Sequence, residues 1–160
     1  MSPRADALRI VSGGQTGVDR AALDVALELG LPCGGWCPRG RRAEDGPLDA
    51  RYLLSETPDE AYEQRTEWNV RDSDGTLILH RGSLHGGTAL TLRLARRYRR
   101  PVLTVDLDDG PEPEAVKDWL DRTAIRVLNV AGPRESGSPG IQEAARRFLR
   151  NVLRLHTLSS

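Results

Sequence analysis

The feature that most constrains the fold is a glycine-rich stretch at residues 10–20, which reads Ile-Val-Ser-Gly-Gly-Gln-Thr-Gly-Val-Asp-Arg. The apolar run at residues 8–11 is typical of a buried strand, and apolar residues recur near the helical period between residues 21 and 29. Glycine lets the chain turn sharply and lets a ligand approach the backbone. A strand, a glycine turn and a helix N-terminus in this order predict an anion pocket, most simply for phosphate. The alternative is a purely structural turn.

The rest of the chain continues this alternation of strands and helices. Strands are expected at residues 31–36, 76–80, 101–107 and 125–130, and helices at residues 59–71, 89–98, 112–122 and 141–155. The alternation predicts an α/β fold with a parallel sheet and right-handed crossovers. Glycine turns also follow the strands at residues 76–80 and 125–130. Because the carboxyl ends of parallel strands meet at one edge, we expect the three turns to form one pocket there.

The candidate binding residues lie in these turns and in a long polar loop at residues 37–47. They are Gly13, Gly14, Gln15, Thr16, Gly17 and Arg20 in and after the first turn; Trp36, Arg39, Arg41 and Arg42 in or beside the loop; His85, Gly86, Gly87 and Thr88 in the second turn; and Asn129, Gly132, Arg134 and Ser136 around the third. Backbone N–H groups, hydroxyls and arginine suit an oxyanion. The alternative for the loop is a solvated segment that neutralises itself, and for Arg134 an ion pair with Glu135 or Glu44.

Other polar residues are interpreted as structural. Asn69, Asp72, Ser73 and Asp74 precede the strand at residues 76–80, at the edge opposite the expected pocket, so bracing is favoured over binding. The run of arginines at residues 96–100 closes a helix, where cations suit the dipole. The alternative for that run is a nucleic-acid surface.

The remaining reactive side chains form no recognisable catalytic set. Cys33 and Cys37 are too few for a zinc site, and we expect free thiols, with a soft metal or a sulfur-bearing ligand as the alternative. His80 and His156 are scattered, and His85 is the histidine that lies in a glycine turn. The sequence therefore predicts a pocket for an anionic ligand rather than an active site.

Length and charge limit the classes of partner. The chain has 160 residues, with 23 basic and 23 acidic side chains and no net charge, so bulk charge supports neither a nucleic-acid nor a membrane partner. No apolar run approaches the length of a membrane span, and the N-terminus has no signal-peptide pattern, so we expect a cytoplasmic protein. We expect one domain at residues 8–155, with flexible tails at residues 1–7 and 156–160.

Five segments of the chain form a recognisable set of motifs: residues 12–20, 35–46, 65–75, 86–88 and 129–136. Together they resemble the motif set of the molybdenum carrier family, whose members are similar to molybdenum-cofactor carrier proteins. The family belongs to the circularly permuted branch of the SLOG superfamily, and the resemblance covers nearly the whole chain, from about residue 8 to residue 153. It implies a Rossmann-like three-layer sandwich, assembled as a homodimer or homotetramer.

The resemblance also implies a ligand. This would be the molybdenum cofactor (molybdopterin), a pterin with a terminal phosphate, or molybdate, with molybdoenzymes as acceptors of the cofactor. Related SLOG domains bind nucleotides, so a nucleotide phosphate is the alternative ligand. Others are nucleoside-monophosphate phosphoribohydrolases, which carry a glutamate just after the second glycine turn. Here Thr88 is followed by Ala-Leu-Thr, and this departure favours a binding protein over an enzyme.

Overall fold

The computed structural model describes residues 7–158, which form a five-stranded parallel sheet between two layers of helices. The elements in chain order are β1 (Arg9–Val11), α1 (Val18–Leu29), β2 (Cys33–Gly34), β3 (Trp36–Cys37), β4 (Ser55–Glu56), α2 (Tyr62–Arg71), β5 (Gly75–His80), α3 (Gly86–Arg97), β6 (Val102–Asp106), α4 (Pro113–Arg122), β7 (Val127–Ala131), the 3-10 turn η1 (Glu135–Gly137) and α5 (Ile141–Leu158). The strand order is β2-β1-β7-β5-β6, and every pair is parallel. A separate two-stranded sheet joins β3 and β4.

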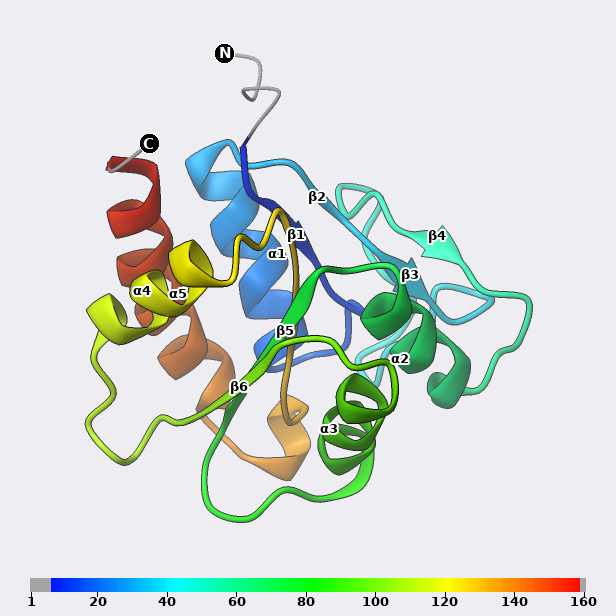
Figure 1. Cartoon of the computed structure of the whole chain (residues 1–160). Helices are drawn as coiled ribbons and strands as arrows, with labels where there is room; N and C mark the ends of the chain where they lie inside the picture. The colour runs from blue at the N-terminus through cyan, green and yellow to red at the C-terminus, as the bar shows by residue number, and fades with distance from the viewer. Residues whose placement is uncertain (1–6, 159–160) are drawn as a thin grey trace.

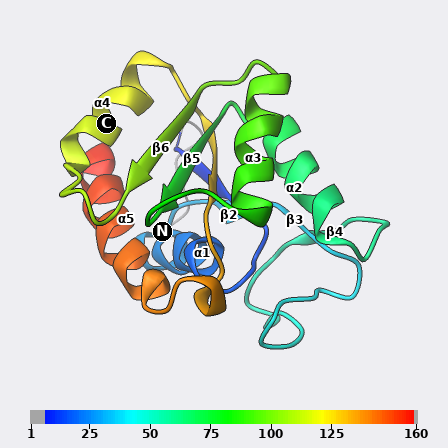
Figure 2. The same cartoon turned by 90° about the horizontal axis from the view of Figure 1, so that it is seen from below.

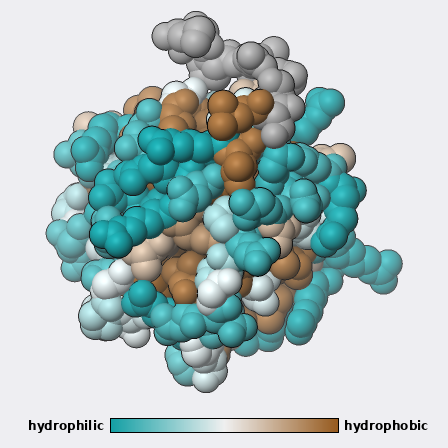
Figure 3. Space-filling model, turned by 90° about the vertical axis from the view of Figure 1, so that its left-hand side faces the viewer, coloured by the Kyte–Doolittle hydropathy of each residue, from teal (hydrophilic) through white to brown (hydrophobic). Residues whose placement is uncertain are grey.

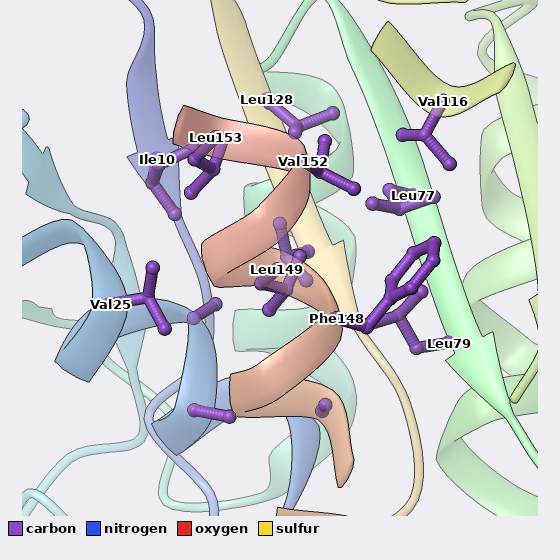
Figure 4. Close-up of a cluster of buried hydrophobic side chains, with 14 of the residues drawn as sticks. Ile10, Val25, Leu77, Leu79, Val116, Leu128, Phe148, Leu149, Val152 and Leu153 are labelled. Atoms are coloured by element: carbon purple, nitrogen blue, oxygen red, sulfur yellow. The ribbon is translucent and has the colours of Figure 1, made fainter. Parts of the chain in front are cut away.

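Helices cover both faces of the sheet, which confirms the expected Rossmann-like three-layer sandwich. Figure 1 shows α1, α4 and α5 on one side of the strands and α2 and α3 on the other. The main core lies between the sheet and the first group, because α1 and α5 each direct an apolar stripe inward. In Figure 4, Phe148, Leu149 and Val152 of α5 pack over Leu77 and Leu128 of the sheet.

Two smaller clusters hold the remaining parts of the chain. Val70 of α2 packs against Leu94 and Ala95 of α3, which fixes these two helices to each other. On the other side, Leu23 of α1 contacts a cluster of loop side chains that includes Leu48. The long loop at residues 37–47 is therefore anchored at its end by apolar contacts.

The expected strand at residues 31–36 is wrong in one respect, because the chain divides it between two sheets. Gly35 sits at the break with φ +121°, a conformation that glycine adopts readily. A Cβ there would lie 2.5 Å from the carbonyl oxygen of Ser12. The close approach of the first glycine turn therefore requires glycine at this position, and β2 pairs with β1 while β3 pairs with β4.

Helix boundaries differ from expectation in three places. The helix expected at residues 89–98 begins at Gly86, because the His85 carbonyl accepts the N–H groups of Thr88 and Ala89. The second helix begins at Tyr62 rather than near residue 59, because the Asp59 carboxylate accepts the N–H of Ala61 in a turn that holds the chain outside the helix. The last helix continues to Leu158, so residues 156–158 of the expected tail are helical. The rest of that tail, and residues 1–6 at the other end, lie outside the described residues.

Within residues 7–158, no helix is both long and apolar enough to cross a membrane. The side of the molecule that carries α4 and α5 shows apolar residues gathered near its centre, with hydrophilic residues around them (Figure 3). Three large apolar side chains, Leu27, Leu53 and Leu158, are exposed in the described part of the chain.

Candidate functional site

A cleft of about 710 Å³ opens at the carboxyl edge of the sheet. It lies where the segments after β1, β5 and β7 come together, and Figure 2 looks onto this edge. The chain leaves β1 and β7 toward one face of the sheet, through α1 and α5, and leaves β5 toward the other face, through α3. Parallel α/β sheets bind ligands at such a topological switch point. The cleft is therefore the candidate site.

Half of the predicted binding residues line this cleft. They are Gly13, Gln15, His85, Gly86, Gly87, Thr88, Asn129, Gly132 and Arg134. The other predicted residues do not line it: Gly14, Thr16, Gly17, Arg20, Trp36, Arg39, Arg41, Arg42 and Ser136. The three turns thus converge as the parallel sheet predicts, while most of the long loop lies outside the cleft.

The second glycine turn presents an open helix N-terminus to the cleft. No described residue accepts the N–H groups of Gly86 and Gly87, the first two residues of α3. A Cβ on either glycine would meet no atom within 4 Å, so the space in front of this backbone is free. Unpaired N–H groups at the positive end of a helix favour an anion. Thr88 and His85 add polar side chains beside it.

The first glycine turn is not open in the same way, and this corrects the sequence-based expectation. The N–H of Thr16 bonds to the Gln15 amide oxygen, and the N–H of Gly17 bonds to Gln142 at 2.8 Å. The N–H of Val18 reaches a backbone carbonyl. The turn therefore satisfies many of its donors from within the protein, and its glycines serve close packing.

The Asp19 carboxyl occupies the position that an anion would take in this turn. Asp19 is only 7% exposed, and its side chain interacts with the N–H groups of Gly13 and Gln15. Burial raises the pKa of Asp19 to about 6, against the lowering effects of Arg65 and of these N–H groups. A carboxyl group with this pKa changes its charge near neutral pH, inside a cleft that also presents an anion-binding terminus.

Arg65 of α2 is the counter-charge for Asp19. Its guanidinium lies 3.7 Å from the Asp19 carboxylate and donates to the Gly13 carbonyl at 2.6 Å. Arg65 is only 8% exposed, so this pair is screened little by solvent. A Cβ on Gly13 would collide with the Arg65 guanidinium, which explains why this residue is a glycine.

The predicted arginines outside the cleft have other partners. Arg20 forms two hydrogen bonds with the Asp45 carboxylate, and Arg39 pairs with Glu60 at 3.7 Å. Arg42 donates to the Glu60 carbonyl. Arg41 donates to four backbone carbonyls, those of Leu48, Asp49, Tyr52 and Leu54. The arginines of the long loop thus fasten it to the chain that follows, at residues 48–60.

Glu44 fastens this loop to the third turn. Its carboxylate accepts the Thr16 hydroxyl, and the N–H and hydroxyl of Ser136 at 3.1 and 2.5 Å. Partial desolvation raises the pKa of Glu44, but the hydrogen bonds from Ser136 and Thr16 outweigh it and lower the pKa overall. Thr16 and Ser136 therefore bond to a protein carboxylate rather than face the cleft.

Arg134 is placed differently from the loop arginines. It lines the cleft, its guanidinium lies 6.0 Å from the centre of the Tyr62 ring, and it forms no ion pair within the described part of the chain. The alternative, a direct salt bridge with Glu135 or Glu44, is not formed, although the charge of Arg134 helps to lower the pKa of Glu44. Two further cations line the cleft: Arg93, and Arg81, which lies 3.1 Å from Asp108.

Several cleft residues were not among the sequence-based candidates. They are Asp19, Tyr62, Glu63, Arg65, Thr66, Arg81, Ser83 and Arg93. Asp19 belongs to the glycine-rich stretch at residues 10–20, and an acidic residue in the first turn of the helix could have indicated that it interacts with the N–H groups there. Arg65 and Thr66 lie in the motif segment at residues 65–75 but were not assigned a binding role, and Tyr62 and Glu63 carried no local signal, because only the fold brings α2 to the cleft.

The four residues predicted to brace the structure do form hydrogen bonds within the protein, but the expectation that they all lie at the edge opposite the cleft is wrong for Asn69. The Asp74 carboxylate accepts the N–H groups of Arg126 and Val127, and the Ser73 hydroxyl donates to a backbone carbonyl. Asn69 bonds to both backbone groups of Trp36 and also lines the cleft. The Asp72 carboxylate accepts the indole N–H of Trp36.

Both cysteines are free thiols, as expected. Burial raises the pKa of Cys33 and of Cys37. Within residues 7–158, no group of three or more histidine, cysteine, aspartate or glutamate side chains could hold a metal ion.

Comparison with known proteins places the chain in a family. The profile of the circularly permutated YpsA SLOG family matches residues 10–153. The chain belongs to this family. A crystal structure of a putative molybdenum carrier protein from Syntrophus aciditrophicus SB has 46% sequence identity and a TM-score of 0.87, over 92% of this chain and 96% of that one. The search of curated proteins gave no match.

Proposed function

We propose that this SLOG domain is a carrier that binds an anionic small molecule in the cleft, with the anion at the N-terminus of α3. One observation carries this proposal: the same cleft contains the unbonded N–H groups of Gly86 and Gly87 and an arginine, Arg134, that has no ion pair in the described chain. Together they supply directed donors and a full positive charge, which a buried oxyanion needs.

The molybdenum cofactor is the ligand we propose. Its terminal phosphate suits the α3 terminus, and its pterin ring offers N–H donors and acceptors that suit Asp19 and Asn129 on the cleft wall. The related protein from Syntrophus aciditrophicus carries the name of a molybdenum carrier. In this role the protein would protect the cofactor in the cytoplasm and release it to molybdoenzymes.

Titration calorimetry with phosphate, molybdate and AMP tests the anion site. Arg134→Ala should weaken binding about tenfold or more, because a hydrogen bond to a charged group contributes about 1.5–3 kcal/mol. Arg39→Ala is the matched control, because Arg39 is paired with Glu60 and does not line the cleft. Equal affinities for both variants and the wild type would reject the site.

Mass spectrometry of the small molecule that co-purifies with the protein under anaerobic conditions tests the ligand. Molybdopterin in the wild type and its loss in Arg134→Ala are expected. A nucleotide in its place would favour a nucleotide-binding domain over a cofactor carrier.

Nucleoside-monophosphate hydrolysis is a second candidate, because two carboxyl side chains, Asp19 and Glu63, line the cleft. Asp19 is on α1 and Glu63 is on α2. Either carboxyl group could therefore act in the absence of the glutamate that phosphoribohydrolases carry after the second turn. Incubation with nucleoside monophosphates decides this. Saturable release of free base that is lost in Asp19→Asn would establish the hydrolase, and we expect none.

A further inference from the structure

Tyr62 is an aromatic side chain of the cleft that lies outside the apolar core. It is the first residue of α2, is half-buried and lines the cleft. The other two tyrosines of the chain, Tyr52 and Tyr98, each pack in or against an apolar cluster. Tyr62 belongs to none of the apolar clusters of the described residues. An aromatic ring that lies beside a cleft rather than in the core is available to a ligand.

Three guanidinium groups surround the Tyr62 ring. Those of Arg65, Arg42 and Arg134 lie 5.1, 5.3 and 6.0 Å from its centre, and they come from α2, the long loop and the third turn. A cation near the face of an aromatic ring is attracted by the negative charge of that face. These contacts hold the ring in place, so a ligand that stacks on it does not have to order it first.

Arg134 is the least restrained of the three arginines. Arg65 donates to the Gly13 carbonyl and Arg42 to the Glu60 carbonyl, whereas the Arg134 guanidinium has neither a hydrogen bond nor an ion pair in the described part of the chain. Carbon atoms in contact lie about 3.5–4.0 Å apart, so at 6.0 Å this guanidinium does not lie flat on the centre of the Tyr62 ring. If Arg134 moves outward, a planar group can enter between them. It would then contact an aromatic face on one side and a guanidinium on the other.

The Tyr62 ring lies beside the proposed anion site. The first residues of α2 and α3 both line the cleft, and Val70 and Leu94 pack together near the other ends of these helices, so the two helices run side by side in the same direction (Figure 2). The axes of packed helices lie about 8–10 Å apart. Tyr62 and the N–H groups of Gly86 and Gly87 are therefore separated by a distance of that order. A mononucleotide, or a pterin with a phosphate on its side chain, can span this separation.

We propose that Tyr62 and Arg134 form a subsite for a planar nitrogen heterocycle, so that the cleft selects phosphates that carry such a ring over phosphates that do not. This inference rests on the proposed function, because it takes the phosphate to lie at the N-terminus of α3. Tyr62 is then the residue that determines specificity, while the α3 terminus binds any phosphate.

Titration calorimetry with AMP and ribose 5-phosphate tests the subsite, because these compounds differ by the base. The wild type should bind AMP about tenfold more tightly or further, which is the usual effect of stacking one base on an aromatic side chain. Tyr62→Leu should weaken AMP binding far more than ribose 5-phosphate binding, and Tyr62→Phe should restore the preference, because the ring makes the stack. Arg134→Lys keeps the charge without the planar group, so the preference for AMP should fall. Tyr98→Leu, at the far end of α3, is the matched control and should keep it.

Two further ligands separate the ring from the phosphate. Adenosine and neopterin each carry a heterocycle and no phosphate, and the tighter of the two shows whether the subsite prefers a purine or a pterin. Equal affinities for AMP and ribose 5-phosphate, or a preference that persists in Tyr62→Leu, would overturn the ring subsite and leave the anion site standing. Equal affinities for AMP and adenosine would instead reject the anion site and leave the ring subsite. A folded wild type that binds none of the four compounds would reject both.

Discussion

The buried carboxyl of Asp19 leads to a quantitative prediction about stability and pH. Its pKa is raised from 3.8 to about 6 in the folded protein, chiefly by burial. Between these values the folded protein holds a proton that the unfolded chain has released, so the free energy of unfolding falls as the pH rises. A pKa difference of one is equivalent to about 1.4 kcal/mol, so Asp19 should cost the folded protein about 3 kcal/mol at pH 7 relative to pH 3.

Urea unfolding of the wild type and Asp19→Asn, at a series of pH values from 3 to 8, measures this effect. Taking the difference between the two proteins removes the contribution of the other carboxyl groups. The wild type should lose stability relative to Asp19→Asn as the pH rises from about 4 to 6. Asp72→Asn is the control, because Arg71 lowers the pKa of Asp72 and the difference should change in the opposite direction. A constant difference for Asp19→Asn across this range would refute the reasoning.

Three other predictions concern a glycine contact, the anchoring of the long loop and the reactivity of the two thiols. Gly132→Ala should lower the free energy of unfolding by about 1–3 kcal/mol in urea titrations, because its Cβ would collide with the Leu79 carbonyl. Glu44→Gln should lower it by about 1 kcal/mol and leave phosphate affinity unchanged by calorimetry, because Glu44 holds the loop rather than the cleft. Cys37, which is fully buried, should react with a thiol reagent only as fast as the protein opens, whereas half-buried Cys33 should react sooner.

The sequence predicted the elements whose pattern is local. The apolar stripes of α1 and α5 and the apolar run of β5 were recognisable, because each element buries a regular face against the same core. The division at Gly35 was not recognisable. The space around Gly35 is limited by Ser12 and Asn69, which are distant in sequence and come close only in the fold.

The position of the site was predictable from the sequence, but the roles of its individual side chains were not. Strand–turn–helix alternation placed the three turns at one edge, because parallel strands leave no other arrangement. The role of each arginine was not predictable from composition. Arg41 and Arg134 both lie in glycine- and proline-containing loops, yet the first donates to backbone carbonyls and the second lines the cleft. Which carbonyls a loop leaves unsatisfied depends on its path, and that path is fixed by tertiary contacts.

The two glycine turns at α1 and α3 show why a motif alone does not identify an anion site. Asp19 is the second residue of α1, and Gly87 is the second residue of α3. In the first turn the carboxyl group of the protein interacts with the N–H donors, whereas in the second nothing within residues 7–158 does so. We infer that a carboxylate at this position helps to fill such a terminus, beside the Gln142 and Pro133 oxygens that accept the N–H groups of Gly17 and Val18 in the first turn.

Gly87→Asp tests this inference, because it gives α3 the residue that α1 carries. The position has no left-handed backbone angle, and a Cβ there would meet no atom within 4 Å, so the variant should fold. A carboxylate at a helix N-terminus contributes about 0.3–1 kcal/mol, so stability should rise while phosphate affinity falls about tenfold or more. Gly87→Asn, which has the same shape without the charge, should keep much more of the affinity. If both variants bind phosphate equally well by calorimetry, the terminus of α3 is not the anion site, and the cleft holds its ligand by other groups.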